Sequence, residues 1–202
     1  MRILRLVCPA LGAWLFIGCT GRPADPQNQG ANLIAEITTL GGTVRFANGD
    51  PGKPVVSVNL SDTKVRDAQL ANLKEFRQLE RLSLAFTGIT DAGLANVEGM
   101  DKLERLVLAL TRVSDKGLLH LRGCSRLRHL DLNFTEVGDS GLATVSSLAS
   151  LRALLLDNTK VTDGGLVQLR TLSKLECLTL SETNITDTGI AHLSSGFALF
   201  EG

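Results

Sequence analysis

The sequence predicts an α/β solenoid, in which short parallel strands stack as one sheet and short helices cover its other side. Leading leucines recur every 24 residues, at Leu79, Leu103, Leu127, Leu151 and Leu175. The period runs without insertion through six units, 55–78, 79–102, 103–126, 127–150, 151–174 and 175–198. Within each unit the apolar spacing changes from two residues to a helical period, so one strand and one helix are expected per unit.

The unit that begins at Leu79 illustrates the expected packing. Leu82 and Leu84 alternate with polar or small residues, as the inward side chains of a half-buried strand do. Ile89 and Leu94 then return to the core from the following turn and helix. Because strands lie about 4.8 Å apart and helices about 8–10 Å, the sheet should line the concave side of a right-handed horseshoe, with the helices on the convex side.

Two polar columns are predicted to be structural. A threonine after each strand can bond backbone groups of its own or the next coil, and an aspartate before each helix is expected to cap it. A glycine two residues later, as in Gly93, should let the helix approach the neighbouring coil. The threonines are Thr63, Thr87, Thr111, Thr135, Thr159 and Thr183, and the aspartates are Asp67, Asp91, Asp115, Asp139, Asp163 and Asp187.

The pattern Leu-x-x-Leu-x-Leu-x-x-Thr-x-Ile/Val-x-Asp-x-Gly-Leu resembles leucine-rich-repeat proteins, most closely the bacterial 24-residue, threonine-containing kind. The resemblance covers residues 55–198 and implies a surface that binds proteins or peptides. The segment Ile89-Thr90-Asp91-Ala92-Gly93-Leu94 is also similar to the cysteine-containing repeats of F-box substrate adaptors. This chain has threonine where those repeats have cysteine and has no F-box, so an adaptor role is the weaker alternative.

The N-terminal residues predict export. Arg2 and Arg5 precede a short apolar run that ends at Ile17, as in a signal peptide spanning 1–18. The segment 16–19 resembles the lipobox of bacterial lipoproteins, which implies cleavage before Cys19 and lipid on its sulfur. An ordinary secretory signal is the alternative.

Three further segments complete the expected organisation. Residues 19–31 should form a flexible tether, and residues 32–54 a helix and hairpin that cap the first coil. Asn32 is expected to cap that helix, and Gly41 with Gly42 to end it. Residues 199–202 look like a broken seventh repeat, with Phe197, Leu199 and Phe200 either covering the last coil or leaving its edge open.

Composition excludes several kinds of function. Removal of the signal leaves 19 basic residues against 21 acidic ones, so nucleic acid is not an expected partner. No metal ligand spacing, phosphate loop or dinucleotide fingerprint occurs, and no cofactor is expected. Ser140, in a segment similar to a protease nucleophile, falls at a variable position of the repeat, and His120, His129 and His192 lie at unrelated spacings. The sequence therefore predicts a chain that is not an enzyme.

Two surface areas are candidate partner sites. Phe86, Leu110 and Phe134 follow three successive strands, with Val107 and Leu155 on the strands nearby. They form either an apolar partner patch or rim packing that the bend partly buries. The second area, acidic and rich in amides, either receives a basic peptide or is a solvated face. It consists of Asp131, Asn133, Asp157, Asn158 and Glu182. Charged residues at the strand starts, among them Arg81 and Arg105, are expected to pair across neighbouring coils.

The predicted function is a non-catalytic interaction module, anchored at the cell envelope through Cys19, that binds a protein or peptide on the concave face. Self-association through an open C-terminal edge, as a structural envelope protein, is the main alternative.

Overall fold

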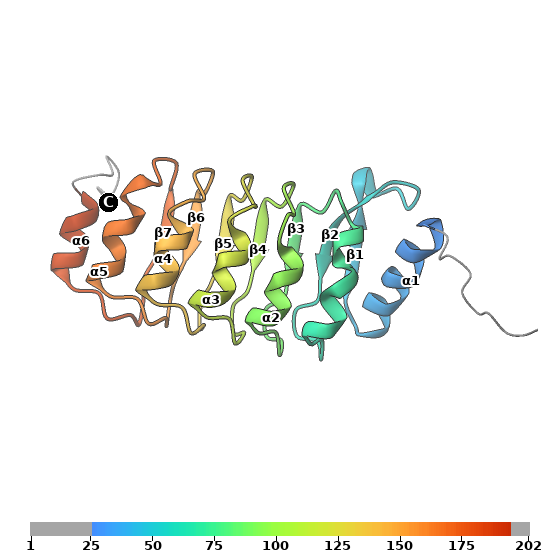
Figure 1. The fold of residues 1–202 in the computed structure, drawn as a ribbon, viewed down its shortest axis with the longest axis horizontal. Helices are drawn as coiled ribbons and strands as arrows, with labels where there is room; N and C mark the ends of the chain where they lie inside the picture. The colour runs from blue at the N-terminus through green and yellow to red at the C-terminus, as the bar shows by residue number, and fades with distance from the viewer. Residues whose placement is uncertain (1–25, 195–202) are drawn as a thin grey trace, which may run out of the picture.

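Seven strands form one sheet in chain order in the computed structural model, which describes residues 26–194. β2 to β7 run parallel, and β1 pairs antiparallel with β2. The helices form a second layer along one side of the sheet, and the stack is elongated (Figure 1). The strands are β1 Thr43–Phe46, β2 Val55–Asn59, β3 Arg81–Ser83, β4 Arg105–Val107, β5 His129–Asp131, β6 Ala153–Leu155 and β7 Cys177–Thr179.

The sheet register follows the spacing of the leucines. Arg81 of β3 pairs with Arg105 of β4, and the same 24-residue step continues to Cys177 of β7. The middle residues of β4, β5 and β6, which are Leu106, Leu130 and Leu154, have no exposed surface. Each such leucine stabilises the fold by about 1.5–3 kcal/mol relative to an exposed one. The predicted α/β solenoid is confirmed.

The helices after β3 to β7 are short and often end in a 3₁₀ turn. Their inner sides carry buried residues such as Leu94 and Val97, which pack onto the strands. The α-helices are α1 Pro26–Thr39, α2 Asp91–Leu94, α3 Asp115–Leu118, α4 Asp139–Val145, α5 Asp163–Leu166 and α6 Asp187–Ser194. The 3₁₀ helices are η1 Ala47–Gly49, η2 Asp67–Glu75, η3 Ala95–Val97, η4 Leu119–Leu121 and η5 Val167–Thr171.

A helix and a hairpin precede the first repeat. α1 begins at Pro26, so residues 26–31 are helical rather than part of a tether, and Asn32 lies inside the helix instead of capping it. Proline suits this first position because it has no N–H to leave without a partner. The helix ends at the expected glycines, where Gly41, at φ 87°, donates to the Thr38 carbonyl and Gly42 donates to the Ile37 carbonyl. The predicted signal peptide, the lipid on Cys19, the first part of the tether and the broken seventh repeat fall on residues 1–25 and 195–202, which lie outside the described residues.

The threonine hydroxyls close the turn of their own coil. Thr87 Oγ1 donates to the Leu84 carbonyl at 2.6 Å, and Thr111 and Thr135 make the equivalent bond. These threonines are buried, so the bonds satisfy hydroxyls that water does not reach. The threonine hydroxyls therefore bond the backbone of their own coil and not that of the next coil.

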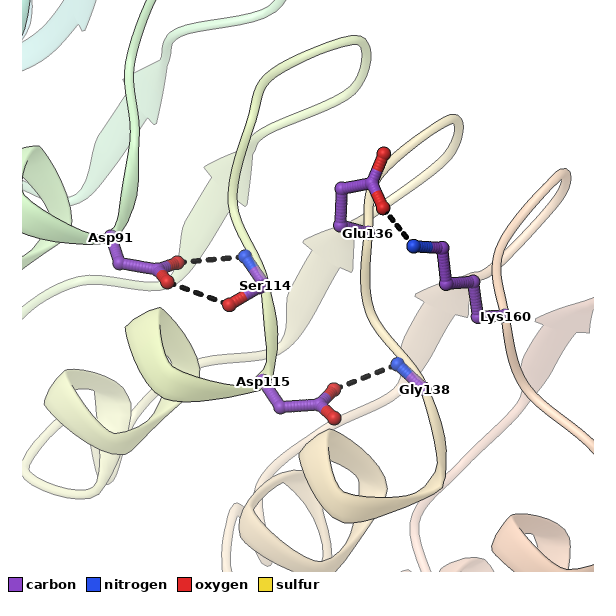
Figure 2. A network of polar contacts seen from close by, with 6 residues as sticks. All are labelled: Asp91, Ser114, Asp115, Glu136, Gly138 and Lys160. Atoms are coloured by element: carbon purple, nitrogen blue, oxygen red, sulfur yellow. Dashed lines mark hydrogen bonds and ion pairs between the residues drawn. The ribbon is translucent and has the colours of Figure 1, made fainter.

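The aspartates join one coil to the next, which corrects the expectation that they cap their own helices. Asp91 Oδ1 accepts the Ser114 N–H at 2.7 Å, and its Oδ2 accepts the Ser114 hydroxyl at 2.6 Å (Figure 2). The capping atom of α3 is instead Ser114 Oγ, which accepts the Lys116 N–H. A carboxylate at the first helical position reaches past its own helix because the neighbouring coil offers two donors there. Donation from Thr186 Oγ1, with its backbone N–H, lowers the pKa of Asp163 in the last such pair.

The recurrent glycine makes room for this carboxylate. A Cβ at Gly117 would lie 2.5 Å from Asp91 Oδ1, and one at Gly141 would lie 2.6 Å from Asp115 Oδ1. Gln69 occupies the equivalent position in the first unit, where no aspartate precedes it by one repeat. The close approach expected for the glycine column is therefore an approach to the aspartate of the preceding coil.

One coil lacks half of this connection. Asp115 accepts only the Gly138 N–H, at 2.7 Å, because glycine has no hydroxyl (Figure 2). The backbone of Gly138, at φ −129°, matches that of Ser114, at φ −121°. A Cβ there would lie 3.7 Å from Asp115 Oδ2, which is an ordinary contact.

We therefore expect Gly138→Ser to stabilise the protein by about 1–2 kcal/mol, because the new hydroxyl would bond Asp115 and cap α4. The measurement is the midpoint of chemical denaturation at an unchanged slope. Ser114→Gly, which removes the same hydroxyl from the neighbouring coil, should lose a similar amount. A loss of stability in Gly138→Ser would contradict this account of the ladder.

Candidate functional site

The face of the sheet away from the helices carries two rows of side chains, one on each side of the buried leucines. Both rows are set by the strand register, so residues 24 apart in sequence are neighbours across the sheet. The first row is Arg45, Ser57, Arg81, Arg105, His129, Ala153 and Cys177. The second row is Thr43, Asn59, Ser83, Val107, Asp131, Leu155 and Thr179.

An apolar ridge, consisting of Phe86, Leu110 and Phe134, lies at the carboxyl ends of β3, β4 and β5. Their side chains are 61%, 39% and 50% exposed. These residues are therefore exposed and do not belong to the core. The Phe86 N–H donates to the Ala109 carbonyl and the Leu110 N–H to the Asn133 carbonyl, both at 2.9 Å. These bonds hold neighbouring coils together, so the three side chains lie on successive coils at the same end of the strands.

The ridge residues have an unusual backbone. Phe86, Leu110 and Phe134 lie at φ 56°, 56° and 57°, in the left-handed region that bulky residues rarely occupy. The same column holds Asp62, Asn158 and Glu182 in other coils, also at positive φ. A non-glycine residue in this region costs on the order of 1–3 kcal/mol. Neither burial nor backbone preference explains three large apolar side chains there.

The remaining residues of the predicted apolar patch do not join into one surface. Val107 and Leu155 are half-buried in the second row, but Asp131 lies between them in the register. The apolar part of the site is therefore the ridge, with two isolated aliphatic side chains on the strands below it.

The predicted acidic area takes part in bonds between coils. Asp131 Oδ1 accepts the Asn133 N–H at 3.0 Å, and Asn133 Oδ1 accepts the Asp157 N–H at 2.7 Å. Asp157 Oδ1 then accepts the Ser181 N–H at 2.7 Å. One oxygen each of Asp131, Asn133 and Asp157 thus bonds the backbone, which accounts for these three residue types without a ligand.

A hollow of about 350 Å³ lies on the first strands of the sheet face. Arginines contribute to its lining from three strands, namely Arg45, Arg81 and Arg105. Polar side chains from Thr43, Ser57, Asn59 and Ser83 complete much of the wall. A second hollow of about 580 Å³ adjoins it, because Arg45 and Arg81 line both.

The predicted charge pairing across coils holds for only some of the residues. Arg128 lies 3.7 Å from Glu104, and Arg152 pairs with Glu176. Among residues 26–194, no carboxylate lies within 4.0 Å of the guanidinium of Arg81 or Arg105. Sequence reasoning grouped these arginines with the paired ones and missed that they face the hollow without an ion pair to the described residues.

The titratable groups do not assemble a catalytic centre within the described part of the chain. Burial, with the nearby Arg105 cation, lowers the pKa of His129, so its ring is neutral at pH 7. Burial raises the pKa of the Cys124 thiol to about 11, which keeps it protonated and a poor nucleophile. Ser140 is the second residue of α4, while His120 bonds Glu98 on another coil. No group of three metal-ligating side chains occurs between residues 26 and 194.

Comparisons with known proteins agree with this geometry. The family described as Leucine Rich repeat matches residues 77–97, 123–146 and 171–194. The comparison with curated proteins gave no match. A crystal structure of an internalin (InlF) from Listeria monocytogenes is similar, with 18% identity and a TM-score of 0.54 over 73% of this chain.

A plant structure has the same fold. The leucine-rich-repeat ectodomain of the receptor kinase GASSHO1/SCHENGEN3 from Arabidopsis thaliana, in complex with CASPARIAN STRIP INTEGRITY FACTOR 2, is 20% identical. It gives a TM-score of 0.53 over 75% of this chain. The chain spans 48% of the internalin and 18% of the plant structure. The fold is therefore a leucine-rich-repeat solenoid.

Proposed function

We propose that this chain is a non-catalytic module that binds a protein or peptide through the apolar ridge and the adjoining sheet face. Solenoids of this type present long surfaces whose side chains vary without affecting the core. The ridge is the observation that carries the proposal. Phe86 and Phe134 are exposed, and their backbone conformation favours other residues, so selection by folding does not account for them.

The ridge is tested by replacing Phe86, Leu110 and Phe134 with asparagine, the residue found at the equivalent Asn158. Asparagine tolerates positive φ, so we expect unchanged or slightly higher stability. Capture of a partner from an envelope extract should fall at least about ten-fold, as happens when interface anchors are removed. The readouts are thermal melting and quantitative pull-down.

The matched control removes exposed aliphatic side chains from the helix side instead. Leu119→Gln with Val167→Gln changes residues that are 46% and 39% exposed and lie far from the ridge in the repeat. This variant should retain capture. Equal capture of the partner by the ridge variant and by the wild type would contradict the proposal.

We also propose that the module is exported and held at the cell envelope by lipid on Cys19. The support is the signal-like segment 1–18 and its lipobox-like end. Between residues 26 and 194, the structure has no helix with the length and apolar character needed to span a bilayer.

Cys19→Ser should move the protein from the membrane fraction to the soluble one, because the lipid would have no attachment site. Several acyl chains give stable anchoring, since each buried CH₂ adds about 0.8 kcal/mol. The measurement is fractionation with mass determination of the mature N-terminus, and Cys177→Ser is the control. Unchanged membrane association of Cys19→Ser would rule out this anchor.

Self-association through the C-terminal edge is the second candidate function. Leu178, Leu180 and Ile185 are only half-buried, whereas their counterparts one repeat earlier have no exposed surface. Within residues 26–194 no strand pairs with the outer edge of β7. An open edge of this kind offers backbone groups to another chain. Light scattering over a range of concentrations decides: a mass that rises with concentration supports this candidate, and a constant monomer mass excludes it.

A further inference from the structure

Three arginines face one side of the sheet at its N-terminal end. Arg45 of β1, Arg81 of β3 and Arg105 of β4 occupy one row of the register, with Ser57 of β2 between the first two. We call Arg45, Arg81 and Arg105 the basic row. All three side chains are exposed, and all line the hollow of about 350 Å³.

The basic row is unfavourable for folding. Arg81 and Arg105 are direct partners on adjacent parallel strands, which lie about 4.8 Å apart, and like charges in that relation are destabilising. No carboxylate of the described residues lies within 4.0 Å of either. Glu104, the nearest acid in sequence to Arg105, pairs with Arg128 instead. Charges of one sign are thus held together where a ligand has access.

The surroundings of the row suit an anion with several oxygens. The hydroxyls of Thr43, Ser57 and Ser83 and the amide of Asn59 lie in the same hollow. Guanidinium groups bind carboxylates through two parallel N–H donors, and hydroxyls can donate to the remaining lone pairs. The row also has a clear limit, because the next residue in it is His129, whose ring is neutral at pH 7, and Asp131 on the same strand carries a carboxylate.

We infer that the basic row binds an acidic peptide segment of the partner, a specification that rests on the proposed protein-binding function. The arginines line a hollow, so the ligand must project side chains into it, which an extended chain does and a flat lipid surface does not. The residues that line the hollow of about 350 Å³ include no aromatic side chain for base stacking, and the chain has as many acidic as basic residues. A peptide with Asp or Glu side chains fits these features.

The position of the row also specifies the order of groups on the ligand. Arg81 begins β3, and Phe86 of the ridge follows five residues later, so the two lie at most about 16 Å apart along the coil. The same relation holds for Arg105 and Leu110. The ligand therefore carries its acidic groups over the end of β1 and the starts of β3 and β4, and an apolar group near the ends of β3 to β5.

The probe for the row is a short fluorescein-labelled peptide of alternating Glu and Gly, titrated into the full chain by fluorescence anisotropy. Wild type should bind it and not the Lys and Gly counterpart, and added NaCl should weaken binding. Arg81→Gln with Arg105→Gln should weaken binding at least about ten-fold. The same variant should melt at an equal or higher temperature, since it relieves the repulsion, whereas arginines needed for folding would lower it.

The matched control, Arg122→Gln with Arg126→Gln, makes the same change of net charge at exposed residues outside the sheet face. It should bind like the wild type. Three results overturn the inference: no binding of the Glu peptide by wild type, an equal loss in the control, or binding only to vesicles of phosphatidylglycerol.

The inference and the proposed function fail separately. Loss of partner capture in the ridge variant, together with no binding of the Glu peptide, supports the proposed binding function. The same result contradicts the inference that the basic row binds an acidic peptide. In the opposite case, wild type binds the Glu peptide, the variant with Arg81→Gln and Arg105→Gln binds it less, and wild type captures no partner. This result supports the basic row as a peptide site and contradicts the proposed function.

Discussion

The fold depends on one repeated contact between coils, in which the carboxylate of one coil accepts donors from the next. Asp139 receives the N–H and the hydroxyl of Thr162 at 2.8 and 2.7 Å, as Asp91 does from Ser114. In the coil that donates these bonds, the glycine two residues after that coil's aspartate leaves space for the carboxylate. The aspartate, the donor residue of the next coil and the glycine must all lie at matching positions. An insertion in any unit would therefore break the contact on both sides. This constraint explains the fixed period.

Because the core is held together in this way, the side chains on the opposite face of the sheet are not needed for folding. Leu106 and its counterparts are buried by the helices, and the turns are closed by buried threonines, so neither requirement involves the outward side chains. These side chains can therefore vary, and their chemical character changes from the first strands of the sheet to the later ones. Basic residues gather over the first strands, Asp131 and Asp157 follow, and the apolar ridge lies along one edge.

Both proposed contact areas are places where the chain departs from what folding favours. Phe86 and Phe134 hold positive φ values that asparagine would adopt more readily, and Arg81 lies beside Arg105 without an acid. Departures of this kind lower stability, and they persist where binding requires them. The bonds made by Asp131 and Asp157 illustrate the converse, since their residue types are explained by the backbone groups that they satisfy.

The sequence by itself determined the solenoid, with one strand and one helix in each unit, and the buried columns. It also determined the need for a small residue at Gly93. The reason is that the periodic placement of apolar residues and of glycine can be read directly from the sequence. It also indicated the ridge as a candidate, and the presence of Asp62 and Asn158 in the same column was an available sign of positive φ. Only the tertiary structure decided that the ridge is exposed, that Asp91 bonds the next coil instead of its own helix, and that Arg81 forms no ion pair with the described residues. The reason is physical: the direction of a side chain depends on which donors and charges the adjacent coil presents, and those lie about one full repeat away in sequence.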